Sequence, residues 1–248
     1  MTFKAAITFD VERDCPGVAD SHLGITKGLP RLLKILSESK ISATFFITGS
    51  VAQKFPQLIQ TLAAQHEIAS HGFTHTTLDG QSSRHIIELR KSKQILEELS
   101  GQTVAGFRAP RLQITSRLFP ALALAGYRYD SSQAMWLPHH RQLQLECTVV
   151  KEFPLLMPNV FLRFPGGLQV FQATLLRGKS PLTLYFHPSE AIPMIHPLRA
   201  AGVQTAGLLK RPDRWVNTGY PFLNRLRKLL RFLHKRRGLL APLRDYLQ

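Results

Sequence analysis

The chain has 248 residues, 44% of them hydrophobic, and is long enough to bury a core without disulfides, which excludes disordered and disulfide-scaffold proteins. Its 32 Lys and Arg against 16 Asp and Glu give a net charge of +16, which favours an anionic partner: nucleic acid, acidic lipid headgroups or a phosphate-linked substrate. Only two cysteines, Cys15 and Cys147, are present, and no signal-like or membrane-length apolar run is found. We therefore expect reduced thiols and a cytoplasmic protein, with a peripheral position at a membrane left open.

The first half of the chain alternates short apolar runs with segments of helical spacing. Residues 3–9 are predicted to form a buried strand, and residues 28–40 follow with leucines three and four positions apart. The helix predicted at 82–101 has clear boundaries, because it opens on serine and ends on glycine. Further strands are predicted at 41–49, 66–72, 104–110 and 127–132, and further helices at 50–65 and 116–126.

The second half is less regular. Residues 149–167 contain three prolines and are predicted to be extended and rich in loops. A helix near 169–178 and a strand within 181–190 follow. Strands that alternate with helices favour an α/β fold with a mostly parallel sheet, with closure into a barrel left open. We expect a single domain over residues 1–248.

The C-terminal segment carries much of the positive charge. Between Lys210 and Gln248 there are eleven basic residues and two acidic ones, and a basic helix is predicted near 221–237. Its leucines form one stripe, which is typical either of a helix on an anionic membrane or of the last helix of the fold. Core packing is favoured, because the residues "LLAPLRDYL" that follow return to core-like spacing.

Five of the predicted strands end in residue types suited to metal binding or proton transfer. The segments are "TFDVERD", "SHGFTH", "FRAP", "YDSS" and "YFHP". In a parallel α/β fold the C-terminal ends of the strands build the site, so we expect these segments to converge. This convergence is the strongest functional signal in the sequence.

The first of these segments contains two carboxylates on one side of a strand. Asp10 and Glu12 are predicted to lie about 7 Å apart along it, so one can bind a metal while the other accepts a proton; ordinary surface acids are the alternative. His71 and His75 form an HxxxH pair that reaches one ion if the chain turns helically there. Two imidazoles and one carboxylate leave positions open on Zn²⁺ for water.

In order and spacing, these segments resemble the five motifs of the polysaccharide deacetylase family (NodB homology, carbohydrate esterase family 4), from the first strand to His187. The resemblance implies a distorted (β/α) barrel and the metal-dependent removal of an acetyl group from a sugar. It implies that Asp10 is the general base and that His71 and His75 are metal ligands. The commonest first motif has two adjacent Asp residues; here a valine follows Asp10, and Glu12 fits the ligand slot of subfamilies that place the carboxylate two positions on.

The resemblance also assigns roles to the later motifs. Arg108 is expected to pair with Asp10 and orient it, and Pro110 to shape that loop. His187 is expected to be the general acid, and Asp130 to hold His187 in its working tautomer.

The leading hypothesis is a zinc-dependent deacetylase of an N-acetylated sugar in a polysaccharide, an oligosaccharide or a lipid- or nucleotide-linked form. One alternative is a hydrolase of a non-sugar amide or cyclic imide, since some such relatives dispense with the metal. Another is a catalytically silent protein that binds carbohydrate or membrane. An anionic membrane surface or a phosphate-linked glycolipid is a further expected partner, whereas nucleic acid is not. The oligomeric state stays open.

Overall fold

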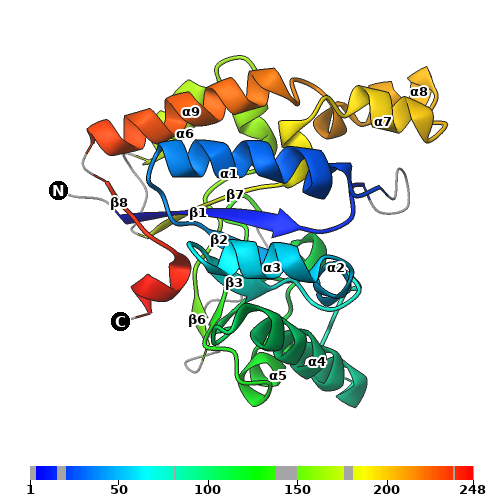
Figure 1. Ribbon diagram of the computed structural model, residues 1–248, viewed down its shortest axis with the longest axis vertical. Helices are drawn as coiled ribbons and strands as arrows, with labels where there is room; N and C mark the ends of the chain where they lie inside the picture. The colour runs from blue at the N-terminus through cyan, green and yellow to red at the C-terminus, as the bar shows by residue number, and fades with distance from the viewer. Residues whose placement is uncertain are drawn as a thin grey trace.

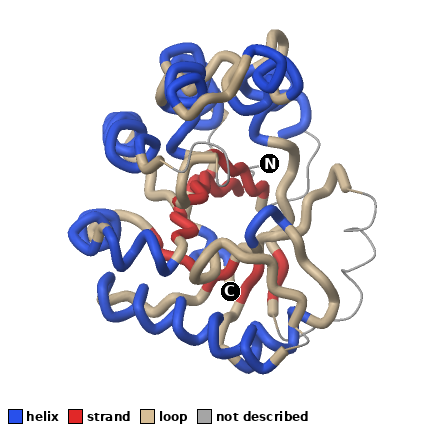
Figure 2. Tube along the Cα trace, turned by 90° about the vertical axis from the view of Figure 1, so that its right-hand side faces the viewer, coloured by secondary structure: helices blue, strands red, loops and turns tan. Residues whose placement is uncertain are grey.

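Figure 2 shows parallel strands curled into a ring, with helices around the outside. The computed structural model describes residues 4–15, 21–80, 82–137, 150–175, 181–236 and 238–247. The strands are β1 (Lys4–Val11), β2 (Thr44–Ile47), β3 (Glu67–Ser70), β4 (Gly106–Phe107), β5 (Tyr129–Asp130), β6 (Lys151–Glu152), β7 (Leu182–Phe186) and β8 (Leu239–Leu240). Their order in the sheet is β6-β5-β4-β3-β2-β1-β7, with β8 paired to the start of β1.

A single residue links the two edges of this curled sheet. Leu155 forms parallel bridges both to Ala134, beyond β5, and to Thr183 in β7. The N–H of Leu156 also donates to the carbonyl of Thr183 at 3.2 Å. The fold is therefore a distorted and incompletely closed (β/α) barrel, as the sequence resemblance implies.

The helices lie on both sides of β1 in Figure 1, with α1, α6 and α9 on one side and α2 to α5 on the other. They are α1 (Leu29–Glu38), α2 (Gly49–Lys54), α3 (Pro56–Ala63), α4 (Ser83–Ser100), α5 (Leu118–Leu124), α6 (Gly167–Leu175), α7 (Ile195–Ala200), α8 (Thr205–Lys210) and α9 (Tyr220–Lys235). The single helix predicted at 50–65 is wrong, because the chain breaks at Phe55. Pro56 has no N–H to donate and starts a new helix there.

Alternation along β1 divides its side chains between two environments. Ile7 and Phe9 pack outward into the main core beneath the helices. Ala6 points the other way, into a smaller apolar cluster with Phe46 and Tyr129 inside the barrel. The next residues on that inward side are polar, which places Asp10 in the barrel interior at the C-terminal end of the strand.

Helix α9 packs its leucines into the protein, as the core-packing interpretation predicts. The buried set is Leu223, Leu226, Leu229, Leu230 and Leu233. The segment after it forms β8 and a helical turn (Leu243–Tyr246), where the Tyr246 hydroxyl donates to the Ala5 carbonyl at 3.1 Å. Among the described residues no helix is both long and apolar enough to cross a membrane. Cys147 lies outside the described residues, and Cys15 is a buried free thiol.

Candidate active site and metal centre

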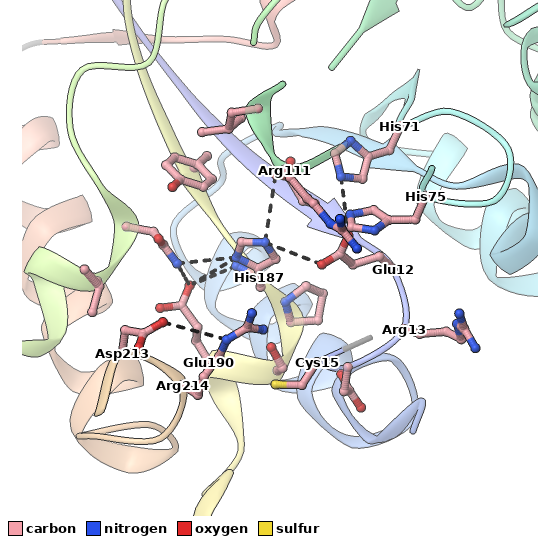
Figure 3. A pocket seen from close by; sticks show the side chains of 18 of the residues that line it. Glu12, Arg13, Cys15, His71, His75, Arg111, His187, Glu190, Asp213 and Arg214 are labelled. Atoms are coloured by element: carbon pink, nitrogen blue, oxygen red, sulfur yellow. Dashed lines mark hydrogen bonds and ion pairs between the residues drawn. The ribbon is translucent and has the colours of Figure 1, made fainter. Parts of the chain in front are cut away.

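The C-terminal ends of β1, β3, β4 and β7 meet around one pocket of about 500 Å³. Asp10 and Glu12 both line it, as strand alternation predicts, and so do His71, His75 and His187. Asp10 is 2% exposed, so it is not an ordinary surface acid. Figure 3 shows Glu12, His71, His75 and His187 gathered on one side of this pocket.

Glu12 and the two histidines form a compact cluster of potential ligand atoms. The Nε2 atom of His71 lies 3.4 Å from Oε2 of Glu12, and Nε2 of His75 contacts the same oxygen. One ligand atom from each of the three residues falls within 4.8 Å of the others. This is the donor set of two imidazoles and one carboxylate that suits a catalytic zinc ion.

The backbone between the two histidines is a tight turn and not a helix, so the proposed helical route to the cluster is wrong. Gly72 has φ of +73° and His75 has φ of +63°, in the left-handed region that interrupts a helix. The carbonyl of Gly72 accepts from the Gly49 N–H at 2.9 Å and from the Ser92 hydroxyl at 2.8 Å. These bonds fix the turn, and the turn brings the second imidazole back to Glu12.

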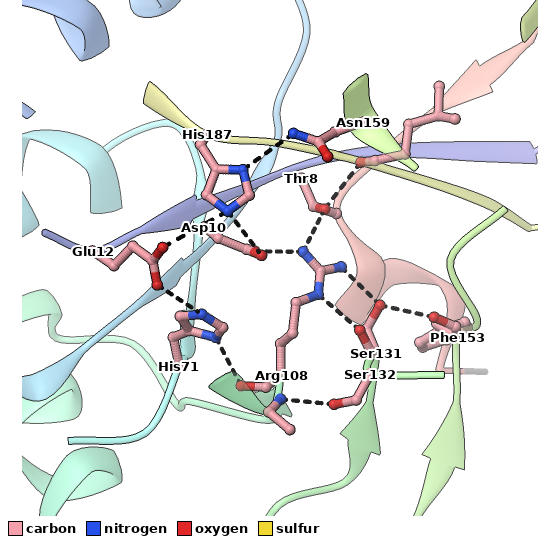
Figure 4. Close-up of polar contacts among 12 residues, drawn as sticks. Thr8, Asp10, Glu12, His71, Arg108, Ser131, Ser132, Phe153, Asn159 and His187 are labelled. Atoms are coloured by element: carbon pink, nitrogen blue, oxygen red, sulfur yellow. Dashed lines mark hydrogen bonds and ion pairs between the residues drawn. The ribbon is translucent and has the colours of Figure 1, made fainter. Parts of the chain in front are cut away.

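The tautomer of His71 is set by the backbone behind it. Its Nδ1 lies 2.8 Å from the carbonyl oxygen of Arg108, which can only accept, so Nδ1 carries a proton (Figure 4). In the neutral ring Nε2 then keeps its lone pair toward Glu12. A backbone carbonyl behind a ligating imidazole is a common way to orient such a ring.

Electrostatics in this cluster favour the ionised carboxylate. Burial raises the pKa of Glu12, but hydrogen bonds from His71 and His75 and the charge of His187 outweigh it and hold the pKa well below the usual value. Burial lowers the pKa of His71, yet the negative charges of Asp10 and Glu12 outweigh burial and raise it. The pocket thus concentrates negative charge where the two imidazoles meet.

Arg108 pairs with Asp10, as the sequence resemblance implies, and its own side chain is completely buried. Its Nη1 donates to Oδ1 of Asp10 at 2.6 Å and to the hydroxyl of Thr8 at 2.9 Å. Its Nε donates to the carbonyl of Ser131 at 2.7 Å, and its guanidinium lies 4.0 Å from the ring centre of Phe46. With its donors engaged on several sides, Arg108 holds the Asp10 carboxylate in one orientation (Figure 4).

Asp130 does not hold His187, which corrects the role that the resemblance implies for it. Its carboxylate accepts from the N–H of Ser132 at 2.9 Å and from the Ser132 hydroxyl at 2.7 Å. The same hydroxyl accepts from the Ala109 N–H at 2.7 Å. Asp130 therefore supports the loop that carries Arg108. Burial raises the pKa of Asp130 and also that of Glu152, whose carboxylate lies against it.

The group that faces Nδ1 of His187 is instead Glu190, at 4.0 Å, together with the Asn159 amide at 3.4 Å. Glu190 also accepts the His187 backbone N–H at 2.9 Å and pairs with Arg163 Nε at 2.7 Å. The opposite ring nitrogen, Nε2, lies 4.0 Å from Asp10 and 3.9 Å from Glu12. These gaps leave room for a reacting group between His187 and the carboxylates.

Sequence reasoning missed Asn159, Arg163 and Glu190. Glu190 follows His187 by three residues in a short helical turn (Pro188–Ala191), so its position in "HPSE" was the available signal. Asn159 and Arg163 come from a separate turn (Asn159–Arg163) within the segment predicted as irregular. No sequence pattern marks that turn as part of the site. His85, predicted to be structural or at the surface, forms an ion pair with Asp79 at 2.9 Å.

Comparison with known proteins was made at the level of sequence. The family model described as polysaccharide deacetylase matches residues 3–129. The chain is 28% identical to a peptidoglycan deacetylase of Helicobacter pylori over 107 residues, which cover 42% of this chain and 36% of that protein. It is 39% identical to a chitooligosaccharide deacetylase of Sinorhizobium fredii over 69 residues, covering 27% and 30% respectively. These matches span about a third of the length of the relatives.

Solved structures share the fold at low sequence identity. A pseudoenzyme of the CE4 family from Bacillus anthracis aligns with a TM-score of 0.62 at 15% identity, over 100% of this chain and 66% of that one. An allantoinase aligns with a TM-score of 0.65 at 15% identity, over 98% of this chain and 88% of the other. At this identity the likeness establishes the barrel architecture alone.

Proposed function

Because this chain belongs to the polysaccharide deacetylase family, we propose that it hydrolyses the acetamide of an N-acetylated sugar at the pocket between Glu12 and His187. The proposal includes a divalent metal ion, most naturally Zn²⁺, bound by Glu12, His71 and His75. The relatives named as peptidoglycan and chitooligosaccharide deacetylases support a sugar substrate. Since the matches cover only a third of those proteins, the activity of this chain is inferred from its own site.

The donor set fits a metal ion. Nδ1 of His71 is committed to the Arg108 carbonyl, so its Nε2 offers a lone pair, and the low pKa of Glu12 keeps its carboxylate ionised. Both imidazole Nε2 atoms face the same carboxylate oxygen, so a cation among the three satisfies them all at once. Bound there, a divalent ion would polarise the acetyl carbonyl and lower the pKa of a water molecule to about 7.

Asp10 is placed to accept the proton of the attacking water. Its Oδ1 is held by Arg108 at 2.6 Å, which leaves Oδ2 directed toward His187 at 4.0 Å. A carboxylate fixed in this way loses little entropy when it takes the proton, and general-base catalysis of this kind contributes about 10²- to 10⁴-fold.

His187 is placed on the other side of the reacting carbon. Its Nε2 faces the two carboxylates, and the negative charge of Glu190 beside Nδ1 favours a protonated ring. A protonated Nε2 can donate to the sugar nitrogen as the amide bond breaks, so the amine leaves as a neutral group. Asp10 and His187 thus flank one site as base and acid.

The observation that carries this proposal is the approach of two imidazole Nε2 atoms to one carboxylate oxygen beside an Arg-held aspartate. The test is acetate release from N-acetylchitooligosaccharides by the protein as purified, after chelation, and after Zn²⁺ is restored. We expect release that chelation abolishes and zinc restores. Hydrolysis of cyclic imides without acetate release would instead indicate the second hydrolase class, and metal binding with no hydrolysis of either would indicate a silent binding protein.

Location and membrane contact are a separate proposal. We place the protein in the cytoplasm, with anionic lipid or a phosphate-linked glycolipid as a partner. Because the leucines of α9 are buried, only its cationic side, including Lys228 and Arg231, is free for such contact. Co-sedimentation with anionic vesicles at low and high salt tests this, since an electrostatic contact weakens as salt rises. No binding at low salt would remove the membrane partner.

A further inference from the structure

Arginine side chains form a large part of the wall of the active-site pocket. Five of them line it, together with five acidic residues. Each of these acids already has a partner within the protein. The pairs are Asp10 with Arg108, Glu12 with His71 and His75, Asp14 with Ser21, Glu190 with Arg163, and Asp213 with Arg211.

Arg111 differs from the acids in having no such partner. Its guanidinium makes no hydrogen bond or ion pair with any residue that the structure describes, although its side chain is exposed to the pocket. Figure 3 shows it extending toward the side of the pocket where His71 and His75 lie. A cation that is not neutralised from within the protein is available to an anionic ligand.

The base of this side chain is fixed in an unusual backbone conformation. Arg111 has φ of 58° and Leu112 has φ of 56°, two consecutive non-glycine residues in the left-handed region. The turn is held by the Leu112 N–H, which donates to the Ala109 carbonyl at 3.0 Å, and by the Gln113 N–H on Pro110 at 3.1 Å. Ala109 is in turn bound to Ser132. The strained turn therefore keeps Arg111 at the pocket and does not leave it on a loose loop.

We infer that the sugar taken by this pocket carries an anionic oxygen group, a phosphate or a carboxylate, and that Arg111 binds it. This inference rests on the proposed function for the identity of the ligand as a sugar. With the acetyl group at Glu12, His71 and His75, the rest of a sugar unit shares the same 500 Å³ pocket with Arg111. The planar guanidinium matches two oxygens of either anion, and a neutral sugar offers no such match.

The binding test uses sugars that the proposed reaction cannot turn over, because they lack the acetyl group. The probes are glucosamine, glucosamine 1-phosphate and muramic acid, and calorimetry gives their dissociation constants for the protein as purified. Arg111→Gln and Arg111→Lys are compared with Arg117→Gln, which removes the same charge from an exposed position six residues away and outside the pocket. Circular dichroism establishes that each variant is folded.

We expect at least one anionic sugar to bind about fivefold more tightly than glucosamine, which is the scale of a partly exposed ion pair. Arg111→Gln should remove this preference, Arg111→Lys should keep part of it, and Arg117→Gln should leave it intact. Preference for the 1-phosphate identifies a phosphate-linked sugar, and preference for muramic acid identifies a carboxylate. Equal binding of all three probes by the wild type, or an equal loss in Arg117→Gln, would overturn the inference.

Acetate release separates this result from the proposed function. Arg111-dependent binding of an anionic sugar without acetate release from its N-acetyl form would keep the anion site and reject the deacetylase. Acetate release from N-acetylglucosamine oligomers with no effect of Arg111→Gln on any probe would do the opposite.

Discussion

The guanidinium of Arg108 and the carboxylate of Asp10 form an ion pair of 2.6 Å that is almost completely removed from solvent. The pair joins the ends of β1 and β4, which are separated by nearly a hundred residues in the chain. It therefore contributes both to the fold and to the orientation of the proposed base. A buried charge pair of this kind is costly to break on one side, because the remaining charge has no water to compensate it.

Arg108→Ala is expected to lower the free energy of unfolding by about 3–5 kcal/mol, because it leaves the Asp10 carboxylate buried without its partner. The double variant Arg108→Ala with Asp10→Asn should recover part of this loss, since the stranded charge is then removed as well. Urea unfolding of the wild type and the three variants gives the coupling between the two sites. Additive losses would mean that the pair has no energetic coupling.

Glu190→Gln should lower kcat about tenfold with a smaller change in KM, because it removes the negative charge that faces Nδ1 of His187. Asp130→Asn is the matched control, since Asp130 contacts Ser132 and not His187. Steady-state acetate release measures both variants, and zinc content shows that the metal cluster is intact. A loss of kcat in Asp130→Asn as large as in Glu190→Gln would restore the role first assigned to Asp130.

Stability should fall with rising pH because of Glu152, whose pKa is raised well above its usual value by burial and by the charge of Asp130. The folded state binds this proton more tightly than the unfolded state. Its contribution is therefore complete below the unfolded pKa of about 4 and is lost as the pH rises through the folded pKa. Glu152→Gln removes the titration, so the variant should gain about 1 kcal/mol or more over the wild type between pH 5 and pH 8.

Urea unfolding at several pH values measures this difference. Glu98→Gln is the control, because Glu98 is an exposed acid on α4 and its neutralisation should leave the pH dependence of the wild type unchanged. A constant offset between Glu152→Gln and the wild type across this range would contradict the account of the buried pair.

Leu226→Ala should cost about 2–5 kcal/mol of unfolding free energy, because Leu226 is fully buried in the core against α9. Lys228→Ala, two residues along the same helix but exposed, should change stability by less than about 0.5 kcal/mol. Thermal or urea unfolding distinguishes the two. A small effect of Leu226→Ala would indicate that the leucine stripe is not part of the core.

The sequence predicted the framework of the site because its main elements obey local rules. Alternation along β1 put Asp10 and Glu12 on one side, and the strand ends of a parallel fold placed His71 and His187 near them. The turn that brings in His75 was not predictable, because it depends on a left-handed glycine and on a hydrogen bond from Ser92.

The partners of His187 were missed for a related reason. Asn159 reaches the site from a segment whose three prolines and irregular spacing give no periodic signal, so its direction follows only from tertiary packing. The break between α2 and α3 at Phe55, by contrast, was readable from the proline that follows it. Local chemistry thus predicted the strands and the residue types, and long-range packing decided which groups touch.

Zinc stoichiometry measured together with acetate release in the wild type, His71→Ala and Asp10→Asn tests the central claim most directly. We expect one zinc per chain and acetate release in the wild type, zinc without turnover in Asp10→Asn, and neither in His71→Ala. Full zinc occupancy in His71→Ala, or full activity in Asp10→Asn, would contradict the assignment of these two residues.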